Sequence, residues 1–147
     1  MKTILFLCTG NSARSIMAEA YMNKVGAGRW RAYSAGSKPT GRPNPFALET
    51  LSAAGVDPGA PRSKSWDEFA SDGAPLLDVV VTVCDNAAGE TCPLWPRRNG
   101  AAPATLHWSF PDPAAAEGDA AAKRSAFEKV FADIRAEIDG FLESQAS

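Results

Sequence analysis

A cysteine and an arginine stand close together where an apolar run near the N-terminus ends. The run KTILFLC occupies residues 2–8, and the loop after Cys8 reads Thr9, Gly10, Asn11, Ser12, Ala13 and Arg14. A thiolate is a nucleophile, and a guanidinium binds two oxygens of an anion with its planar fork. This spacing therefore predicts a nucleophile, Cys8, aimed at the centre of an oxyanion that Arg14 holds.

The elements around this loop are predicted to be a strand and a helix. Residues 2–8 are short and apolar, which is typical of a buried strand. Residues 14–25 place apolar side chains at helical spacing, and Asn11 or Ser12 is expected to cap this helix. The loop would therefore lead directly into a helix N-terminus.

A loop in this position is suited to binding an anion. It points several backbone N–H groups at one spot, and the helix dipole adds partial positive charge there. We therefore expect residues 9–14 to cradle a tetrahedral oxyanion, with Gly10 giving the backbone the freedom it needs. The same environment is expected to lower the pKa of Cys8 and favour its thiolate.

Strands and helices alternate along the rest of the chain. Further strands are expected over 30–35, 78–84 and 104–108, and helices over 45–54, 65–70 and 123–143. Alternation of this kind predicts right-handed β-α-β units, and hence one α/β domain over residues 1–147 with a parallel sheet and helices on both faces.

Two of the three cysteines are expected to meet in this fold. Cys8 and Cys84 both end predicted strands, and the carboxyl ends of parallel strands lie along one edge of the sheet, where ligands bind. Cys92 follows Cys84 in a loop rich in Gly, Pro and Asn, long enough to carry function. The pattern lacks a C-x2-C pair and the chain has one histidine, so we expect no metal site.

Composition excludes several classes of function. The net charge is −2 and no block of like charges occurs, so neither a nucleic acid nor a membrane is expected as a partner. The apolar stretch from Ile4 to Cys8 is shorter than the roughly 7–15 residues of a secretory signal. Three cysteines without such a signal indicate thiols rather than a disulfide scaffold. We therefore expect an unprocessed cytoplasmic protein, working as a monomer.

Several stretches of the chain are similar to one known superfamily. LFLCTGNSARS, YSAG at 33–36, NPFALETL at 44–51, VVVTVCDNAAGETCP at 79–93 and HWSFPDPA at 107–114 resemble the low-molecular-weight protein tyrosine phosphatases. That superfamily also contains arsenate reductases coupled to thioredoxin or other thiol systems. The resemblance implies a four-stranded parallel sheet in the order 2-1-3-4. It also implies that Asp112 is the general acid and that Ser15 hydrogen-bonds the Cys8 sulfur.

The two branches of the superfamily are separated by residues outside the anion loop. A reductase needs further thiols to carry electrons, and the VTVC…CP arrangement of Cys84 and Cys92 resembles the reductase branch. Phosphatases usually have an aromatic residue after Asp-Pro, whereas Ala114 follows Pro113 here. We therefore expect an arsenate reductase, with a low-molecular-weight phosphatase as the alternative and a non-catalytic anion-binding protein as a third possibility.

The resemblance implies a mechanism and an external reductant. Arsenate would bind at the loop, Cys8 would attack arsenic, and a disulfide would pass from Cys8–Cys84 to Cys84–Cys92. Thioredoxin, or glutaredoxin with glutathione, would then restore the thiols, and no bound cofactor is expected. A small thiol could instead resolve the Cys8 adduct directly, which would leave Cys92 idle. The choice of donor stays open.

Some reductases of the superfamily hold a potassium ion behind the loop, bound partly by residues that align with Asn11, Glu19 and Ser34. In this chain Lys64 stands near the place of a further acidic ligand. We expect its ammonium group to replace the ion.

Overall fold

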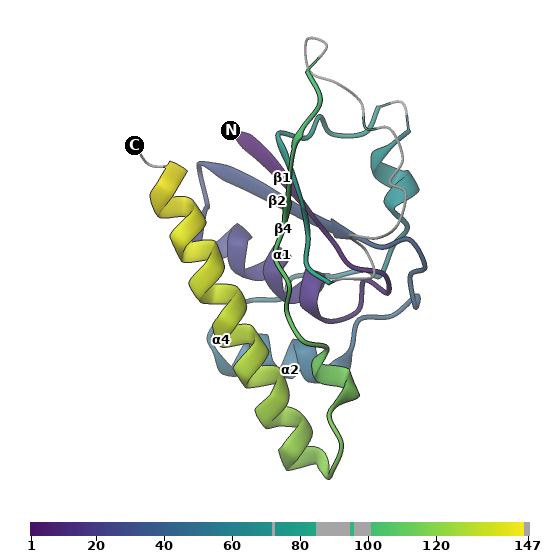
Figure 1. The fold of residues 1–147 in the computed structure, drawn as a ribbon, viewed down its shortest axis with the longest axis vertical. Coiled ribbons are helices and arrows are strands. Elements are labelled where there is room, and N and C mark those ends of the chain that lie inside the picture. The colour runs from purple at the N-terminus through teal and green to yellow at the C-terminus, as the bar shows by residue number, and fades with distance from the viewer. Residues whose placement is uncertain (72, 85–94, 96–100, 146–147) are drawn as a thin grey trace.

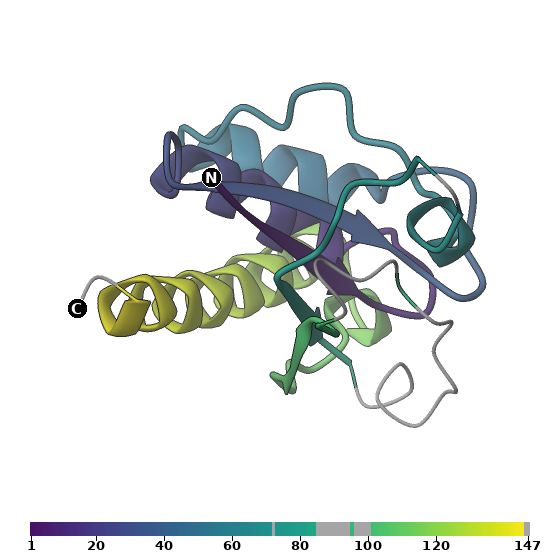
Figure 2. The same ribbon diagram turned by 90° about the horizontal axis from the view of Figure 1, so that it is seen from above.

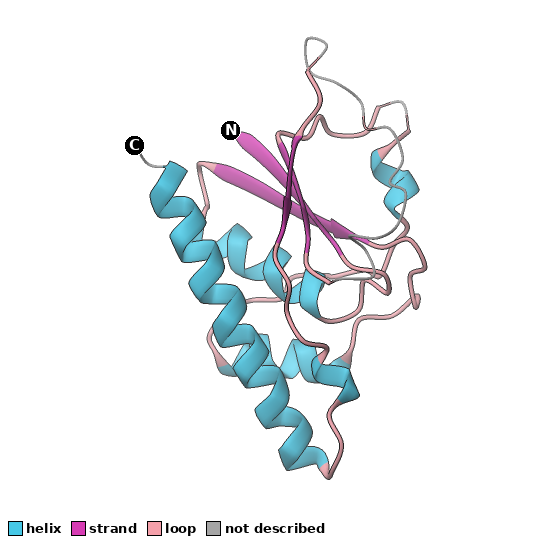
Figure 3. Cartoon of the chain, in the orientation of Figure 1, coloured by secondary structure: helices cyan, strands magenta, loops and turns pink. Residues whose placement is uncertain are grey.

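The structure is a computed structural model that describes residues 1–71, 73–84, 95 and 101–145. Figures 1 and 3 show strands and helices alternating in the N-terminal part of the chain, and a long helix near its C-terminal end. The elements, in chain order, are β1 Lys2–Leu7, α1 Arg14–Val25, β2 Trp30–Ala35, α2 Pro45–Ala53, η1 Trp66–Phe69, β3 Val79–Thr82, β4 Ala104–His107, η2 Pro113–Ala115 and α4 Ala120–Gln145.

The strands form one four-stranded sheet in the order β2-β1-β3-β4, and every pairing is parallel. In register, Leu7 of β1 lies opposite Ala35 of β2 and Thr82 of β3. The parallel α/β sheet and its order are therefore confirmed. The chain places β2 on one side of β1 and then crosses over to place β3 on the other side, so the crevice beyond the carboxyl ends of β1 and β3 is a topological switch point.

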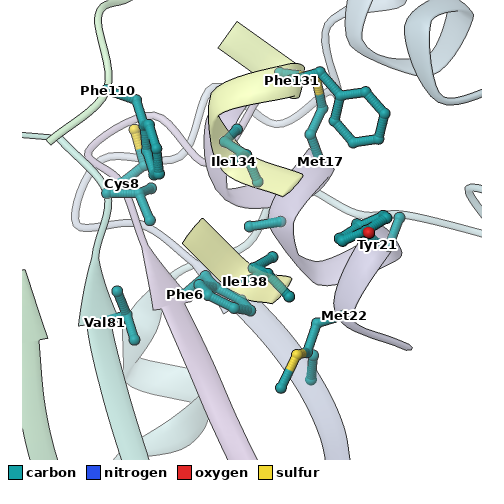
Figure 4. Packing of buried hydrophobic residues seen from close by; sticks show 14 of the residues in the cluster. Phe6, Cys8, Met17, Tyr21, Met22, Val81, Phe110, Phe131, Ile134 and Ile138 are labelled. Carbon is teal, nitrogen blue, oxygen red and sulfur yellow. The ribbon is translucent and has the colours of Figure 1, made fainter. Parts of the chain in front are cut away.

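The two faces of the sheet carry separate cores. Alternate residues of β1, Ile4 and Phe6, pack with α1, α2 and α4 on one face, which Figure 4 shows from close by. Leu5 and Leu7 point to the other face, where they pack with the 3-10 helix η1. Figure 2 shows η1 across the sheet from α4. Helices thus cover both faces, although the α-helices α1, α2 and α4 share one of them.

Local sequence explains most helix boundaries. The Asn44 side chain accepts a hydrogen bond from the Phe46 N–H and caps α2, which then begins at Pro45. Gly55, just past α2, has a φ of 75°, which suits glycine. The expected cap of α1 is wrong: Ala13 is the N-cap residue and no side chain caps this helix. The side chain of Asn11 is used elsewhere, as described below.

The C-terminal helix closes the larger core. It buries a stripe at helical spacing: Phe127, Val130, Phe131, Ile134, Ile138 and Leu142. The sequence predicted this helix over 123–143, and the observed helix is longer at both ends. None of the helices in the described part of the chain combines the length and the apolarity that crossing a membrane requires.

Candidate active site

The loop between β1 and α1 is shaped by Asn11. This residue is fully buried and has a φ of 44°, in the left-handed region that Asn tolerates better than most residues. Its Oδ1 accepts the backbone N–H of Lys64 at 2.9 Å, and its Nδ2 donates to the Ser15 hydroxyl at 2.8 Å. Asn11 therefore joins the loop to the first turn of α1 and to the segment behind it.

Neighbouring segments hold the outer side of the loop through its carbonyl groups. The Thr9 carbonyl accepts the Lys38 N–H at 2.9 Å, and the Gly10 carbonyl accepts the Ser63 hydroxyl at 3.1 Å. Gly36 packs so closely that a Cβ there would lie 2.4 Å from the Thr9 carbonyl oxygen. The Gly10 N–H, by contrast, acts on Cys8 as a hydrogen-bond donor and lowers the pKa of its thiol. The loop thus turns two of its carbonyl groups toward neighbouring segments and an N–H group toward the sulfur.

Cys8 and Cys84 meet beyond the ends of β1 and β3. Both are thiols, 5% and 3% exposed respectively, and they lie near enough for the Cys84 side chain to be the main influence on the pKa of Cys8. The Thr9 hydroxyl lies 3.9 Å from the Cys84 sulfur, within hydrogen-bond range for sulfur. The backbone bond from the Val83 N–H to the Leu7 carbonyl, 2.8 Å long, extends the β1–β3 ladder up to this pair. The expectation that the two cysteines lie together at one edge of the sheet is therefore confirmed.

The pKa of Cys8 is raised, contrary to the lowering expected from the sequence. The hydrogen bond with the Cys84 thiol is the main cause, and burial adds to it. The charge of Arg14 and the Gly10 N–H act in the opposite direction but do not outweigh them. The Cys8 thiol therefore holds its proton more tightly than an ordinary cysteine.

An open pocket of about 480 Å³ lies above this pair. Its walls come from three elements of the chain and consist of Thr9, Arg14, Cys84, Ser109, Phe110, Pro111 and Asp112. Asp112 is exposed, and its Oδ1 accepts the Ala114 N–H at 3.0 Å as the cap of η2. Arg14 and Asp112 thus face the same space, one as a cation and the other as a carboxyl group.

The segment that carries Asp112 also holds Arg14. The Nη1 atom of Arg14 donates to the Phe110 carbonyl oxygen at 3.0 Å. The Phe110 ring lies beside Cys8 and is itself buried (Figure 4). Sequence reasoning missed both roles of Phe110, as well as the close packing of Gly36. The sequence showed only that Phe110 is an apolar residue two positions before Asp112. Its bond to Arg14 could not be predicted, because any residue type has the backbone carbonyl that accepts it.

Behind the loop, Lys64 forms a buried ion pair. Its Nζ lies 3.8 Å from Glu19 Oε1, and the two side chains are 7% and 17% exposed. Burial raises the pKa of Glu19 and lowers the pKa of Lys64, and each partner partly offsets this shift in the other. The Lys64 ammonium therefore supplies the positive charge beside Glu19, so these residues do not fit a further cation such as potassium. That Lys64 replaces such an ion stays a prediction.

The other expected site residues have mixed outcomes. Ser15 is fully buried and its hydroxyl accepts from Asn11, while its bond to the Cys8 sulfur stays a prediction. Ser12 and Ala13 lie in the loop, and the Ser12 carbonyl accepts the Asn44 N–H at 2.8 Å. Cys92 lies outside the described residues. Within the described part of the chain, no group of three or more His, Cys, Asp or Glu side chains is placed to bind a metal ion.

Comparisons with known proteins agree with this geometry. The arsenate reductase of Bacillus licheniformis is 39% identical over 146 residues, covering 97% of this chain and 96% of that protein. A solved arsenate reductase in the phosphate binding state has a TM-score of 0.76 at 24% identity and covers 98% of both chains. The thioredoxin-dependent arsenate reductase Cg_ArsC1' of Corynebacterium glutamicum has a TM-score of 0.70 at 24% identity, covering 98% of this chain and 61% of that one.

A family-wide sequence comparison identifies the group to which these proteins are related. The sequence model for low molecular weight phosphotyrosine protein phosphatase matches residues 3–146, which is nearly the whole chain. The match spans the loop after β1, the Cys84 strand end and the Asp112 segment, so it covers every part of the site described above. This chain therefore belongs to the low molecular weight phosphotyrosine protein phosphatase family.

Proposed function

We propose that this protein is a thiol-dependent arsenate reductase. One observation carries the proposal: a second buried thiol, Cys84, lies beside the nucleophile Cys8 and lines the pocket that Arg14 and Asp112 also line. The curated relatives that match over nearly their whole length, up to 39% identical, bear the name arsenate reductase. The residues of the site supply every group that such a reaction needs before the external reductant acts.

Arsenate would bind in the loop of residues 8–14. The backbone N–H groups of the loop and the N-terminus of α1 offer donors and partial positive charge. Arg14 would bind two arsenate oxygens with its fork. The pKa of the Cys8 thiol is raised, so the reaction needs a base, and an oxygen of the doubly charged anion would take the thiol proton. Arg14 and the Gly10 N–H, which both lower this pKa, would stabilise the thiolate that is left.

The chemical steps need a nucleophile, an acid and a second thiol. Cys8 attacks arsenic and forms an As–S bond, while Asp112 protonates the oxygen that leaves as water. Cys84 then attacks the Cys8 sulfur, and the As–S bond breaks with its electron pair staying on arsenic. Pentavalent arsenic is thereby reduced to arsenite, and the two sulfurs are oxidised to a Cys8–Cys84 disulfide.

The disulfide must then be returned to thiols. We propose that Cys92 attacks Cys84 and moves the disulfide to the loop as Cys84–Cys92, where an external dithiol protein reduces it. Thioredoxin is one candidate, since a solved relative of the same fold is titled thioredoxin-dependent. Glutaredoxin with glutathione is the other. Because this chemistry needs thiols, the protein would work in a reducing compartment such as the cytoplasm. We propose that it does so as a monomer.

The alternative, phosphotyrosine hydrolysis, makes less use of this site. A cysteinyl-phosphate mechanism needs Cys8, Arg14 and Asp112, but it gives no role to a thiol in contact with the nucleophile. It also requires a surface for the phenyl ring, and the exposed residue after Asp112-Pro113 is Ala114 rather than an aromatic residue. The position of Cys84 therefore favours reduction over hydrolysis.

The test is arsenate-dependent consumption of reductant. Turnover would be measured with thioredoxin and thioredoxin reductase, and separately with glutaredoxin and glutathione. Wild type would be compared with Cys8→Ser, Cys84→Ser and Cys92→Ser. We expect Cys8→Ser and Cys84→Ser to abolish turnover and Cys92→Ser to abolish it with thioredoxin. Full activity in both Cys84→Ser and Cys92→Ser would refute the relay, and wild type that hydrolyses phosphotyrosine but consumes no reductant would refute the function.

A further inference from the structure

The reduced Cys8–Cys84 pair is placed to act as a chelating dithiol. Cys8 is the first residue beyond β1, and Cys84 is the second residue beyond the neighbouring strand β3. The hydrogen bond of 2.8 Å from the Val83 N–H to the Leu7 carbonyl oxygen holds the two strand ends together. Both cysteine side chains are buried there, and the Cys84 thiol is near enough to be the main cause of the raised pKa of Cys8. Paired strands are rigid, and the loop after β1 is further held by Asn11 and Gly36. The pair is thus preorganised, because little conformational freedom is lost when both sulfurs bind one atom.

We infer that this pair is itself a binding site for trivalent arsenic, holding one arsenic atom through two As–S bonds. Trivalent arsenic is a soft centre, and soft centres prefer thiolate ligands to oxygen or nitrogen ligands. The inference rests on the proposed function, because arsenite is the product of that reaction. It adds that the reduced protein recaptures this product at the residues that made it.

The reaction balances without any oxidant or reductant. Arsenous acid loses two hydroxyl groups, which leave as two water molecules with the protons of the Cys8 and Cys84 thiols. Two S–H and two As–O bonds break, while two As–S bonds and two water O–H bonds form. Arsenic stays trivalent and both sulfurs stay in the thiol oxidation state, so the reduced protein needs no partner for this step.

The site is reached through the pocket. Cys84 lines the pocket directly, whereas Cys8 lies below it, so an arsenical entering from solvent meets Cys84 first and then closes on Cys8. Arsenous acid is uncharged near neutral pH and gains no Coulomb attraction from Arg14. Capture therefore depends on the two sulfurs, whereas arsenate binding depends on Arg14. Because both ligands use Cys8 in the reduced protein, arsenite is expected to inhibit competitively with arsenate.

The experiment measures thiol loss on capture of phenylarsine oxide, a trivalent arsenical that binds dithiols. Reduced protein, freed of reductant, would be titrated with the arsenical, and the remaining thiols counted with a chromogenic disulfide. Cys92→Ser is the reference variant, because it leaves only Cys8 and Cys84. We expect it to lose both thiols at one arsenical per chain, reversibly by a dithiol but not by a monothiol. Circular dichroism checks that each variant is folded.

Single-thiol variants in the same background supply the comparison. In Cys92→Ser/Cys84→Ser and Cys92→Ser/Cys8→Ser only one As–S bond can form, so affinity should fall by about 100-fold or more, as expected when a second attachment is lost. Equal affinity in the reference and single-thiol variants would overturn the inference. The inference would also be overturned if capture required Cys92 and persisted in Cys8→Ser, because the chelating pair would then be Cys84 and Cys92.

The outcome is separable from that of the proposed function. Capture is measured without arsenate or an external reductant. A chain that reduces arsenate but binds phenylarsine oxide no better than a monothiol refutes this inference alone. A chain that captures the arsenical through Cys8 and Cys84 but never consumes reductant with arsenate refutes the proposed function and leaves the dithiol site intact.

Discussion

The guanidinium of Arg14 donates a hydrogen bond of 3.0 Å to the backbone carbonyl of Phe110, two residues before Asp112. This bond joins the first residue of α1 to the segment that carries the carboxyl group of the site. The proposed anion-binding residue and the proposed acid are thus held relative to each other, although they lie far apart in the sequence. Changes to either residue should act on arsenate chemistry more than on the fold.

Arg14→Lys should lower kcat/KM for arsenate by about 100-fold or more. Lysine keeps the charge but lacks the planar guanidinium, which can bind two arsenate oxygens while it also donates to the Phe110 carbonyl oxygen. The measurement is arsenate-dependent reductant consumption. Arg124→Lys is the matched control, because Arg124 pairs with Glu49 on the surface, 3.0 Å away. A loss of less than threefold in Arg14→Lys would argue against a bidentate role.

Asp112→Asn should lower kcat by about 100-fold or more, because the amide cannot protonate the leaving oxygen. The asparagine Oδ1 can still accept the Ala114 N–H, so the cap of η2 is kept and the fold should be unchanged. Asp119→Asn is the control: Asp119 also accepts a backbone N–H, from Ala122 at 3.0 Å, outside the pocket. Wild-type kcat in Asp112→Asn would exclude this carboxyl as the acid.

Asn11→Ala should reduce the free energy of unfolding by about 3 kcal/mol, measured by urea denaturation. Two effects add: alanine is strained at a φ of 44°, and the buried Lys64 N–H loses its acceptor. Asn11→Gly avoids the first effect and keeps only the second, because glycine adopts this φ freely, so its loss should be smaller. Equal losses in the two variants would show that backbone strain contributes nothing.

Lys64→Met should destabilise the fold by about 3–5 kcal/mol near neutral pH, because it leaves the Glu19 carboxylate buried and unpaired. Burial already raises the pKa of Glu19, and losing Lys64 raises it further. A carboxyl with a raised pKa binds its proton more tightly in the folded state, so stability rises as pH falls through that pKa. The deficit of the variant should therefore shrink in mild acid.

The control for Lys64→Met removes the unpaired charge as well. Glu19→Gln/Lys64→Met should recover most of the lost stability and show no such pH dependence, since no buried carboxylate remains. Unfolding free energies of both variants and wild type, compared at neutral and mildly acidic pH, decide the point. A single-variant deficit that stays constant across this range would mean that lost packing, not the charge of Glu19, is responsible.

Cys84→Ala should lower the pKa of Cys8, because the hydrogen bond that mainly raises this pKa is removed while Arg14 and the Gly10 N–H remain. The pKa is read from the pH dependence of Cys8 alkylation by iodoacetamide in a Cys92→Ser background. The same background with Cys84 intact is the reference. An unchanged or higher pKa in Cys84→Ala would show that burial governs the Cys8 thiol.

Much of the fold was predictable because its signals are local. The strand Trp30–Ala35 and the helix Arg14–Val25 were predicted with their observed bounds, since hydrophobic periodicity spans only a few residues. The cap of α1 was predicted wrongly for a non-local reason. The side chain of Asn11, although well placed in sequence to cap, is buried and bonded to Lys64 and Ser15 instead.

The sequence by itself determined which chemical groups were present: the thiol and guanidinium of one loop, a second thiol after another strand, and a carboxyl before proline. It also predicted which edge of the sheet the two thiols would share. Tertiary structure decided which of them touch. It placed Cys84 against Cys8, bonded Arg14 to the Phe110 carbonyl and put Lys64 behind the loop. It also reversed the expected pKa shift of Cys8, because a pKa depends on burial and on neighbours that only folding brings together.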